Sequence, residues 1–314
     1  MRVTGVVLLY HRVADEADDP LELAVSRQHF DEHMAVVRRV GRPCSLAAMV
    51  AGARAGRVPR RSMAVTFDDG YADVATNAAP ILERHGIPAT AYLTAAMIGT
   101  DECFWWDRLA SAVLDPPRLP DTLELVVGGR AHQWRVTDHD EADRWEHSRR
   151  WLLQALQAVL RPLRTGESVA LVAQVERWAG RTPAPPGARR TLTEAEVRDL
   201  ADGGLVDIGA HTMTHPQLSA IDPDEQADEI VRSKQRLEAM VGRPVTTFAY
   251  PYGDRADYDA GSVRCVREAG FTSACANVVG RVSRRSDPFA LPRVHVSDCD
   301  GDGLLARLRR IEGA

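Results

Sequence analysis

The sequence lacks the features of a membrane-spanning or exported chain. No apolar stretch among its 314 residues approaches the roughly 18 residues that a membrane-spanning helix needs. The apolar run in the N-terminal MRVTGVVLLYHRV is too short for the hydrophobic region of a signal peptide, and it lacks a small-residue cleavage site. We therefore expect a cytoplasmic protein with no membrane span.

An excess of positive charge and a cysteine framework are also missing. The formal net charge is -5, so the chain has no basic surface of the kind that binds nucleic acid. Its five cysteines are odd in number, widely spaced and without a CxxC pair, which argues against disulfides and against a thiolate zinc site. The composition, 45% hydrophobic and 26% charged, is instead typical of a globular protein with a large core. Nothing in the sequence indicates an oligomeric state.

Seven short apolar runs, each bounded by turn or cap residues, are present along the chain. Nearly continuous apolarity over such short runs is typical of strands that are buried on both faces of a parallel sheet. The runs are residues 5–10, 63–67, 89–94, 205–210, 246–250, 271–276 and 291–296.

Segments with helical periodicity lie between these runs. The clearest, residues 222–241, begins at the capping residue Asp222 and ends before Gly242. Residues 72–85 and 258–269 likewise end before a glycine. The alternation of strand and helix predicts the α/β class, as a barrel or an open parallel sheet.

The alternation stops between residues 101 and 190. All six tryptophans fall in this segment, together with the proline- and arginine-rich RTPAPPGARR. We predict a mainly helical insertion, a lid or a subdomain, within a single domain that spans residues 1–314, with helices near residues 142–160 and 167–179. Most of the tryptophans are expected to form a local core, with Trp105 and Trp106 as candidates to line a sugar-sized cleft.

Residues with catalytic or metal-binding side chains directly follow several of the apolar runs. In parallel α/β folds, the carboxyl ends of the strands form the functional site. The sequence places His11, Asp68 with Asp69, HTMTH at 211–215 and YPYGD at 250–254 in this position. Arg293 and His295, two residues apart in the last run, are expected on one face of a strand.

The HTMTH segment carries two imidazoles four residues apart, His211 and His215. They can bind one metal ion if the segment forms a helical turn, although Pro216 places His215 at the end of such a turn. One carboxylate of the Asp68–Asp69 pair could complete the three protein ligands of a catalytic zinc site, and the other would stay ionised as a general base. Alone, the histidines could be unconnected and the aspartates could cap a turn; their joint occurrence favours the metal site.

Taken together, these motifs resemble a known family. TFDDG at 66–70, HTMTH and PYG at 251–253 resemble the first three motifs of the polysaccharide deacetylases of the NodB-like, carbohydrate esterase family 4 type. LLYHRV near the start is similar to the YHxV opening of one branch. The resemblance covers roughly residues 5–98 and 192–297, without the tryptophan-rich segment. It implies a distorted (β/α)7 barrel and metal-dependent hydrolysis of an N-acetyl group on an amino sugar.

The resemblance also implies roles for individual residues. Asp68 matches the general base. The metal ligands that it implies are Asp69, His211 and His215. Tyr252, which follows Pro251 in the PYG motif, matches a residue whose backbone N–H stabilises the tetrahedral oxyanion, so both are expected at the substrate site.

Two positions depart from the family pattern. Ala249 stands where the third motif usually opens with an arginine that steadies the base. The late histidine follows Leu291 with one residue more than the family's Leu-x-x-His pattern has. We expect Arg293 to replace the missing arginine and His295, or otherwise His11, to protonate the leaving amine. A buried core histidine is the alternative interpretation of His295.

The expected function is metal-dependent N-deacetylation of an N-acetylated amino sugar in a polysaccharide, an oligosaccharide or a small glycoconjugate. A cytoplasmic location favours a nucleotide-linked or lipid-linked sugar, or a sugar on a natural product. Zinc is the expected cofactor, and cobalt, manganese or nickel would suit the same ligands. The alternatives are a small-molecule amide hydrolase on the same scaffold, such as a deformylase or an imidase, and a carbohydrate-binding pseudoenzyme.

Overall fold

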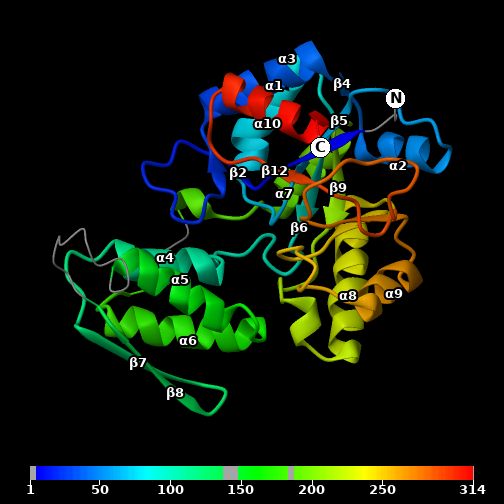
Figure 1. Ribbon diagram of the computed structural model, residues 1–314. Helices are drawn as coiled ribbons and strands as arrows, with labels where there is room; N and C mark the ends of the chain where they lie inside the picture. The colour runs from blue at the N-terminus through cyan, green and yellow to red at the C-terminus, as the bar shows by residue number, and fades with distance from the viewer. Residues whose placement is uncertain (1–4, 137–147, 183–186, 314) are drawn as a thin grey trace. The chain divides into compact units, whose positions relative to one another are not determined.

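The computed structural model describes residues 5–136, 148–182 and 187–313, which belong to two compact units (Figure 1). One unit combines the segments Met1–Thr100 and Thr191–Ala314, and the other is Asp101–Arg190. The bounds of the second unit are those expected for the insertion. Trp145 and the first part of the helix predicted at 142–160 lie outside the described residues.

The larger unit is built on a parallel sheet with the strand order β11-β10-β9-β6-β5-β1-β12. Its strands coincide with the seven predicted runs to within one residue or are shorter. They are β1 (Val6–Tyr10), β5 (Ser62–Phe67), β6 (Ala89–Leu93), β9 (Val206–Ala210), β10 (Thr247–Ala249), β11 (Ser273–Cys275) and β12 (Val294–His295). A parallel bridge between Cys275 and Leu291 brings the segment before β12 back to β11. The sheet therefore curls into a barrel, and the predicted fold class is confirmed.

Short strands and helices complete this unit. β4 (Arg42–Pro43) pairs with β5, and β2 (Arg12–Val13) pairs with β3 (Ala24–Val25). The helices are α1 (Arg27–Val40), α2 (Leu46–Arg54), the π-helix η1 (Val74–Ala78), α3 (Ala79–His85), α7 (Glu194–Asp202), the 3-10 turn η4 (Leu218–Ala220), α8 (Pro223–Val241), α9 (Ala260–Glu268) and α10 (Gly301–Gly313). Helices α1, α3 and α10 lie together on one side of the barrel, and α8 lies beside α9 on another (Figure 1).

The predicted cap signals are present at α8. Its first turn is closed by a capping box between Asp222 and Glu225, and its end by Gly242 in the left-handed conformation, with φ at 67°. The helix predicted at 72–85 is present as η1 continuing directly into α3, and it ends as predicted at Gly86, which has a φ of 59°.

Strand residues alternate between an outer core under the helices and an inner core within the barrel. In β5, Val65 and Phe67 pack in the outer core, whereas Ala64 packs in the inner core with Tyr92 of β6. A Cβ atom at Gly209 would lie 2.4 Å from the Tyr92 ring, so β9 passes this ring only because it has a glycine there. Residues an even number of positions beyond Ala64 in β5, or beyond Gly209 in β9, also face the interior of the barrel.

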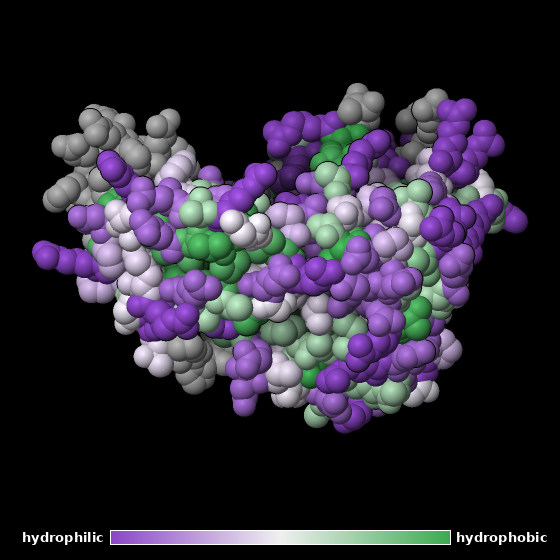
Figure 2. All heavy atoms as spheres, turned by 90° about the horizontal axis from the view of Figure 1, so that it is seen from below, coloured by the Kyte–Doolittle hydropathy of each residue, from purple (hydrophilic) through white to green (hydrophobic). Residues whose placement is uncertain are grey.

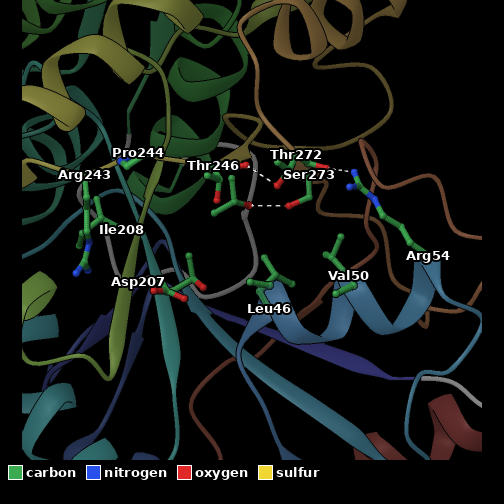
Figure 3. A pocket seen from close by; sticks show the side chains of 14 residues that line it. Leu46, Val50, Arg54, Asp207, Ile208, Arg243, Pro244, Thr246, Thr272 and Ser273 are labelled. Carbon is green, nitrogen blue, oxygen red and sulfur yellow. Dashed lines mark hydrogen bonds between the residues drawn. The ribbon is translucent and has the colours of Figure 1, made fainter.

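A pocket of about 310 Å³ lies at the amino ends of β6, β9, β10 and β11, beside α2 (Figure 3). Leu46 and Val50 of α2 form an apolar wall, and Arg54 donates a hydrogen bond to the carbonyl oxygen of Thr272. The predicted catalytic residues follow the carboxyl ends of the strands. This pocket is therefore at the opposite end of the barrel from them.

The 101–190 unit contains three α-helices and one β-hairpin among its described residues. The helices are α4 (Trp105–Leu114), α5 (Arg149–Leu160) and α6 (Thr165–Trp178), followed by the short η3 (Gly187–Arg189). The hairpin, which was not predicted, pairs β7 (Thr122–Val127) with β8 (Arg130–Arg135). It turns at Gly128 and Gly129, both at positive φ, as a two-residue hairpin turn requires.

The sequence predicts neither a membrane-spanning helix nor a disulfide. Within the described part of the chain, no helix combines the length and the apolar character needed to cross a bilayer. On the face drawn in Figure 2, hydrophilic side chains cover most of the surface and hydrophobic ones lie in separate groups. All five cysteines, each of them described, are free thiols.

Candidate active site

Asp68 and Asp69 directly follow β5, at the carboxyl end of the strand. Asp69 has a φ of 73°, in the left-handed region that is rare for residues other than glycine, and Gly70 continues the turn at 94°. Asp68 lies an even number of residues beyond Ala64, so it faces the interior of the barrel as Ala64 does. Both side chains are almost fully buried, with 3% of Asp68 and 2% of Asp69 exposed. The turn therefore brings two adjacent carboxylates into the mouth of the barrel.

The 211–215 loop follows β9 and is not helical, so the predicted helical turn is wrong. Thr212 and His215 have φ values of 62° and 65°, and the Thr212 hydroxyl accepts a hydrogen bond of 2.9 Å from the His215 backbone N–H. This loop brings the rings of His211 and His215 to a centroid distance of 4.8 Å. The sequence signal against a helix was Pro216, which disfavours helical angles in the residue before it.

Asp69, His211 and His215 converge as a candidate metal site. Their ligand atoms all lie within 4.8 Å of one another, and Asp69 Oδ1 is 3.6 Å from His211 Nε2 and 3.4 Å from His215 Nε2. Ligand atoms at about 2.0–2.2 Å from a tetrahedral zinc ion are separated by about 3.3–3.6 Å, so the two distances between the carboxylate and the imidazoles fit such an ion. His211 Nδ1 donates a hydrogen bond of 2.8 Å to the Ala249 carbonyl, which leaves Nε2 available to a metal.

The protonation states of the cluster also suit a metal. Burial acts to raise the pKa of Asp69, but a hydrogen bond from His215 and the neighbouring imidazoles lower it to about 2. Burial lowers the pKa of His211 to about 4, although the Asp68 carboxylate acts in the opposite direction. At neutral pH Asp69 is ionised and His211 is neutral, and these are the forms that bind metal ions.

Arg293 holds Asp68 in a bidentate ion pair inside the barrel. Nη1 donates to Oδ1 and Nη2 to Oδ2, each at 2.7 Å, and Nε donates to the Ala276 carbonyl at 3.1 Å. Burial acts to raise the pKa of Asp68, but the charge of Arg293 holds it below its usual value. Asp68 Oδ2 is also 3.9 Å from His211 Nε2. Arg293 thus has the contacts expected of a residue that replaces the motif's missing arginine.

Replacing Arg293 with methionine is expected to destabilise the protein strongly, because Asp68 would remain buried without its partner. Removing one member of a buried ion pair typically lowers the free energy of unfolding by about 3–5 kcal/mol. Urea unfolding of the metal-free protein measures this change. The double variant with Asp68→Asn should recover part of the loss, since the unpaired charge is gone. A double variant as unstable as the single one would contradict the assignment.

The two candidate acids, His11 and His295, lie beside each other. β1 pairs with β12 in the register Leu9 to His295, and the ring centroids of the two histidines are 5.3 Å apart. Burial, followed by the charges of His11 and Arg307, lowers the pKa of His295 to about 4, so it is neutral at neutral pH. Nδ1 of His11 is buried and has no hydrogen-bond partner among the described residues.

The PYG turn follows β10 and reaches the metal-ligand cluster. Tyr252 has a φ of 60°, and its ring meets that of His215 at a centroid distance of 4.8 Å. Gly253 has a φ of 78°, and a Cβ atom there would lie 2.7 Å from the backbone nitrogen of Asn277. Pro251 is buried, and its carbonyl accepts a hydrogen bond of 2.6 Å from Gly253. The turn therefore depends on glycine, and it places Tyr252 beside a candidate ligand.

Trp105 and Trp106 belong to the 101–190 unit. Both are buried, with 5% and 6% of their surfaces exposed. Trp106 stacks on Phe104 at a centroid distance of 4.4 Å and meets Trp105 edge-on at 5.6 Å. These contacts describe a local aromatic core, and a role of either residue in a cleft stays a prediction.

Backbone strain is concentrated at the candidate site. Among the described residues, six other than glycine have positive φ, and four of them belong to its loops: Asp69, Thr212, His215 and Tyr252. Strained conformations of this kind persist where the surrounding structure holds them, often at functional sites.

The sequence reasoning missed the two groups that orient the histidines, the Thr212 hydroxyl and the Ala249 carbonyl. A threonine three residues before His215 is a recognisable local signal, whereas a backbone carbonyl leaves none.

The chain belongs to the polysaccharide deacetylase family. The family model matches residues 55–133 and 153–274, which is more than half of the chain, and confirms the resemblance. The match runs into the tryptophan-rich segment, which we had expected to lie outside it. The YHxV opening lies outside the matched residues.

Two curated relatives match parts of the chain. The Bacillus subtilis protein YxkH is 29% identical over 111 residues, which are 35% of this chain and 38% of YxkH. The poly-beta-1,6-N-acetyl-D-glucosamine N-deacetylase of Escherichia coli K12 is 35% identical over 86 residues, which are 27% of this chain and 13% of that protein. The chain thus matches well under two thirds of the length of either relative.

The fold is similar to that of a solved deacetylase. The structure of the Streptococcus pyogenes deacetylase PplD in complex with acetate aligns with a TM-score of 0.62 at 16% sequence identity. The alignment covers 98% of both chains. At this identity the likeness concerns the fold, and it agrees with the barrel described above.

Proposed function

We propose that this chain is a metal-dependent deacetylase that hydrolyses the N-acetyl group of an amino sugar, releasing acetate and a free amine. The observation that carries the proposal is the position of Asp68, paired with Arg293, beside the cluster of Asp69, His211 and His215. A binding module has no need of an ionised carboxylate next to three metal ligands. Family membership and the deacetylase names of the relatives support the same reaction.

The proposed cofactor is a divalent ion, zinc in the first place, with cobalt, manganese and nickel as alternatives. Asp69, His211 and His215 would hold it through the atoms whose spacing fits a tetrahedral ion. When bound, the ion supplies Lewis acidity to the acetamide carbonyl and makes water a stronger acid.

Asp68 is the proposed general base. Each of its oxygens keeps a lone pair beside the hydrogen bond from Arg293, so the carboxylate can accept a proton from the attacking water. The bidentate ion pair with Arg293 fixes the orientation of the carboxylate, and with it the direction of these lone pairs. The backbone N–H of Tyr252 is proposed to donate to the oxyanion, a type of contact whose removal lowers turnover by about 100-fold or more.

The leaving nitrogen needs a proton, which we assign to His295 or otherwise to His11. Because His295 is neutral in the resting protein, it must first receive a proton, and the proton that Asp68 takes from water is available for this. Removing the acid is expected to lower kcat by about 10²–10⁴-fold. Acetate release by His295→Ala and by His11→Ala identifies which residue it is. Full activity in both variants would exclude the assignment.

We propose the 101–190 unit as a subdomain of the same enzyme, since the family match runs into it. Its action as a lid stays a prediction, as does the cytoplasmic location.

The proposed substrate is an N-acetylated amino sugar, in an N-acetylglucosamine polymer or in a smaller glycoconjugate. The name of the Escherichia coli relative supports the polymer. A panel of polymer, oligosaccharide, nucleotide-linked sugar and small amides separates these substrates, with acetate, formate and ammonia measured for each. Acetate release that a chelator abolishes and zinc restores is the expected result. Release of formate or ammonia in its place would favour a small-molecule amide hydrolase.

A further inference from the structure

The carboxylate of Glu229, on α8, binds the loop that carries both candidate histidine ligands. Its Oε2 accepts hydrogen bonds from the backbone N–H groups of Met213 and Thr214, each at 2.8 Å. Its Oε1 accepts one from the Thr214 hydroxyl at 2.7 Å. Glu229 therefore holds the middle of the 211–215 loop with three hydrogen bonds, each to a charged acceptor and hence among the stronger kinds.

The opposite side of this loop is held by the segment that follows β6. The N–H of Ala95 donates to the Thr212 carbonyl at 3.0 Å, and the N–H of Ala96 to the Met213 carbonyl at 2.8 Å. The N–H of Thr94 donates to the Asp69 carbonyl at 3.1 Å, so the same segment also joins the loop of the third ligand. The carbonyl groups of Thr212 and Met213 are thus bound by backbone, whereas the amides of Met213 and Thr214, in the middle of the loop, are bound by the Glu229 side chain.

The conformation that Glu229 holds is a strained one. Thr212 and His215 lie on either side of the bound amides, and both have left-handed φ values. Such conformations are sparsely populated unless surrounding contacts hold them. Without Glu229, the amides of Met213 and Thr214 and the Thr214 hydroxyl would lose this carboxylate as an acceptor, and the loop would be less strongly held in the conformation that brings the two imidazoles together.

We propose that Glu229 is a positioning residue of the metal site, which sets the spacing of His211 and His215 through the loop between them. The inference rests on the proposed metal site. Glu229 is half-buried, and it acts through the backbone of Met213 and Thr214. A carboxylate suits this position because both its oxygens only accept hydrogen bonds. A glutamine could accept from the two amides only through an uncharged oxygen, and it would turn an NH2 group toward the Thr214 hydroxyl, which would then have to accept instead of donate.

The test measures metal affinity, so it does not depend on the substrate. The metal-free full-length protein and its Glu229→Gln and Glu229→Ala variants are titrated with zinc in competition with a chromophoric chelator. Asp228→Asn is the matched control, since it removes a carboxylate charge from the exposed neighbouring position of the same helix. Loss of a residue that orients metal ligands lowers affinity by about 10–100-fold, and we expect this for both Glu229 variants but not for the control.

The absorption spectrum of the cobalt-loaded protein gives a second readout, because it reports ligand geometry. It should change in Glu229→Gln and stay unchanged in Asp228→Asn, whereas a purely structural role would lower thermal stability and leave the spectrum intact. Zinc affinity and a cobalt spectrum equal to wild type in Glu229→Gln, which preserves the volume of the side chain, would overturn the proposal even if Glu229→Ala fails to fold. A wild-type protein that binds no zinc would overturn the metal site itself.

Discussion

Replacing Asp68 with asparagine is expected to remove most of the turnover and to leave metal binding in place. The substitution keeps the shape of the side chain but removes the ionised group that accepts the proton from water. Loss of a general base lowers turnover by about 10²–10⁴-fold. The metal ligands Asp69, His211 and His215 are unchanged. Measuring kcat for acetate release together with the zinc content of the purified variant separates the two effects.

The matched control for Asp68→Asn is Asp207→Asn. Asp207 is an exposed aspartate near the amino end of β9, on the same barrel, and its loss changes the net charge by the same amount. It should behave as wild type in both measurements. An Asp68→Asn protein that loses zinc together with activity would contradict the division of roles between the two aspartates.

The seven strands could be predicted because both faces of each strand are buried. A parallel strand covered on both faces is apolar at nearly every position, so it leaves a short continuous apolar run in the sequence. The candidate site followed from the same reasoning, because the carboxyl ends of parallel strands lie at one end of a barrel. Asp68 and His211, directly after two of the strands, and His295, at the end of a third, are therefore placed at the same end of the barrel by topology alone.

The local geometry of the site could not be predicted in the same way. The 211–215 loop is held by tertiary contacts from Ala95, Ala96 and Glu229, which lie far from it in sequence. The four-residue spacing of its histidines favoured a helical turn, and these contacts stabilise a left-handed loop in its place. The pairing of Arg293 with Asp68 was expected only because Ala249 stands where the third motif of the family usually has an arginine. No local pattern indicates it, because 225 residues separate the two side chains.

The hairpin of the 101–190 unit was missed for a different reason. Its strand Thr122–Val127 buries Leu123, Leu125 and Val127 on one face and exposes the residues between them. This alternation, with Gly128 and Gly129 at the turn, is a local signal that the search for continuous apolar runs passes over. An exposed two-stranded element leaves a different pattern from a barrel strand.

Replacing Asp69 with asparagine is expected to have the opposite effect from Asp68→Asn, because it removes the only anion among the three candidate ligands. With two histidines and a neutral amide as ligands, zinc is expected to bind more weakly than to the wild type. The loss of affinity should exceed the loss of about 10–100-fold that follows changes in residues that orient metal ligands. The carboxylate of Asp69 lies 3.4 Å and 3.6 Å from the two imidazole nitrogens, whereas Asp68 is 3.9 Å from His211 Nε2 and is held by Arg293. Zinc titration of the metal-free variant measures the loss, and added zinc should restore part of the acetate release. Wild-type zinc affinity in Asp69→Asn, with turnover lost, would assign the base to Asp69 and the metal ligand to Asp68.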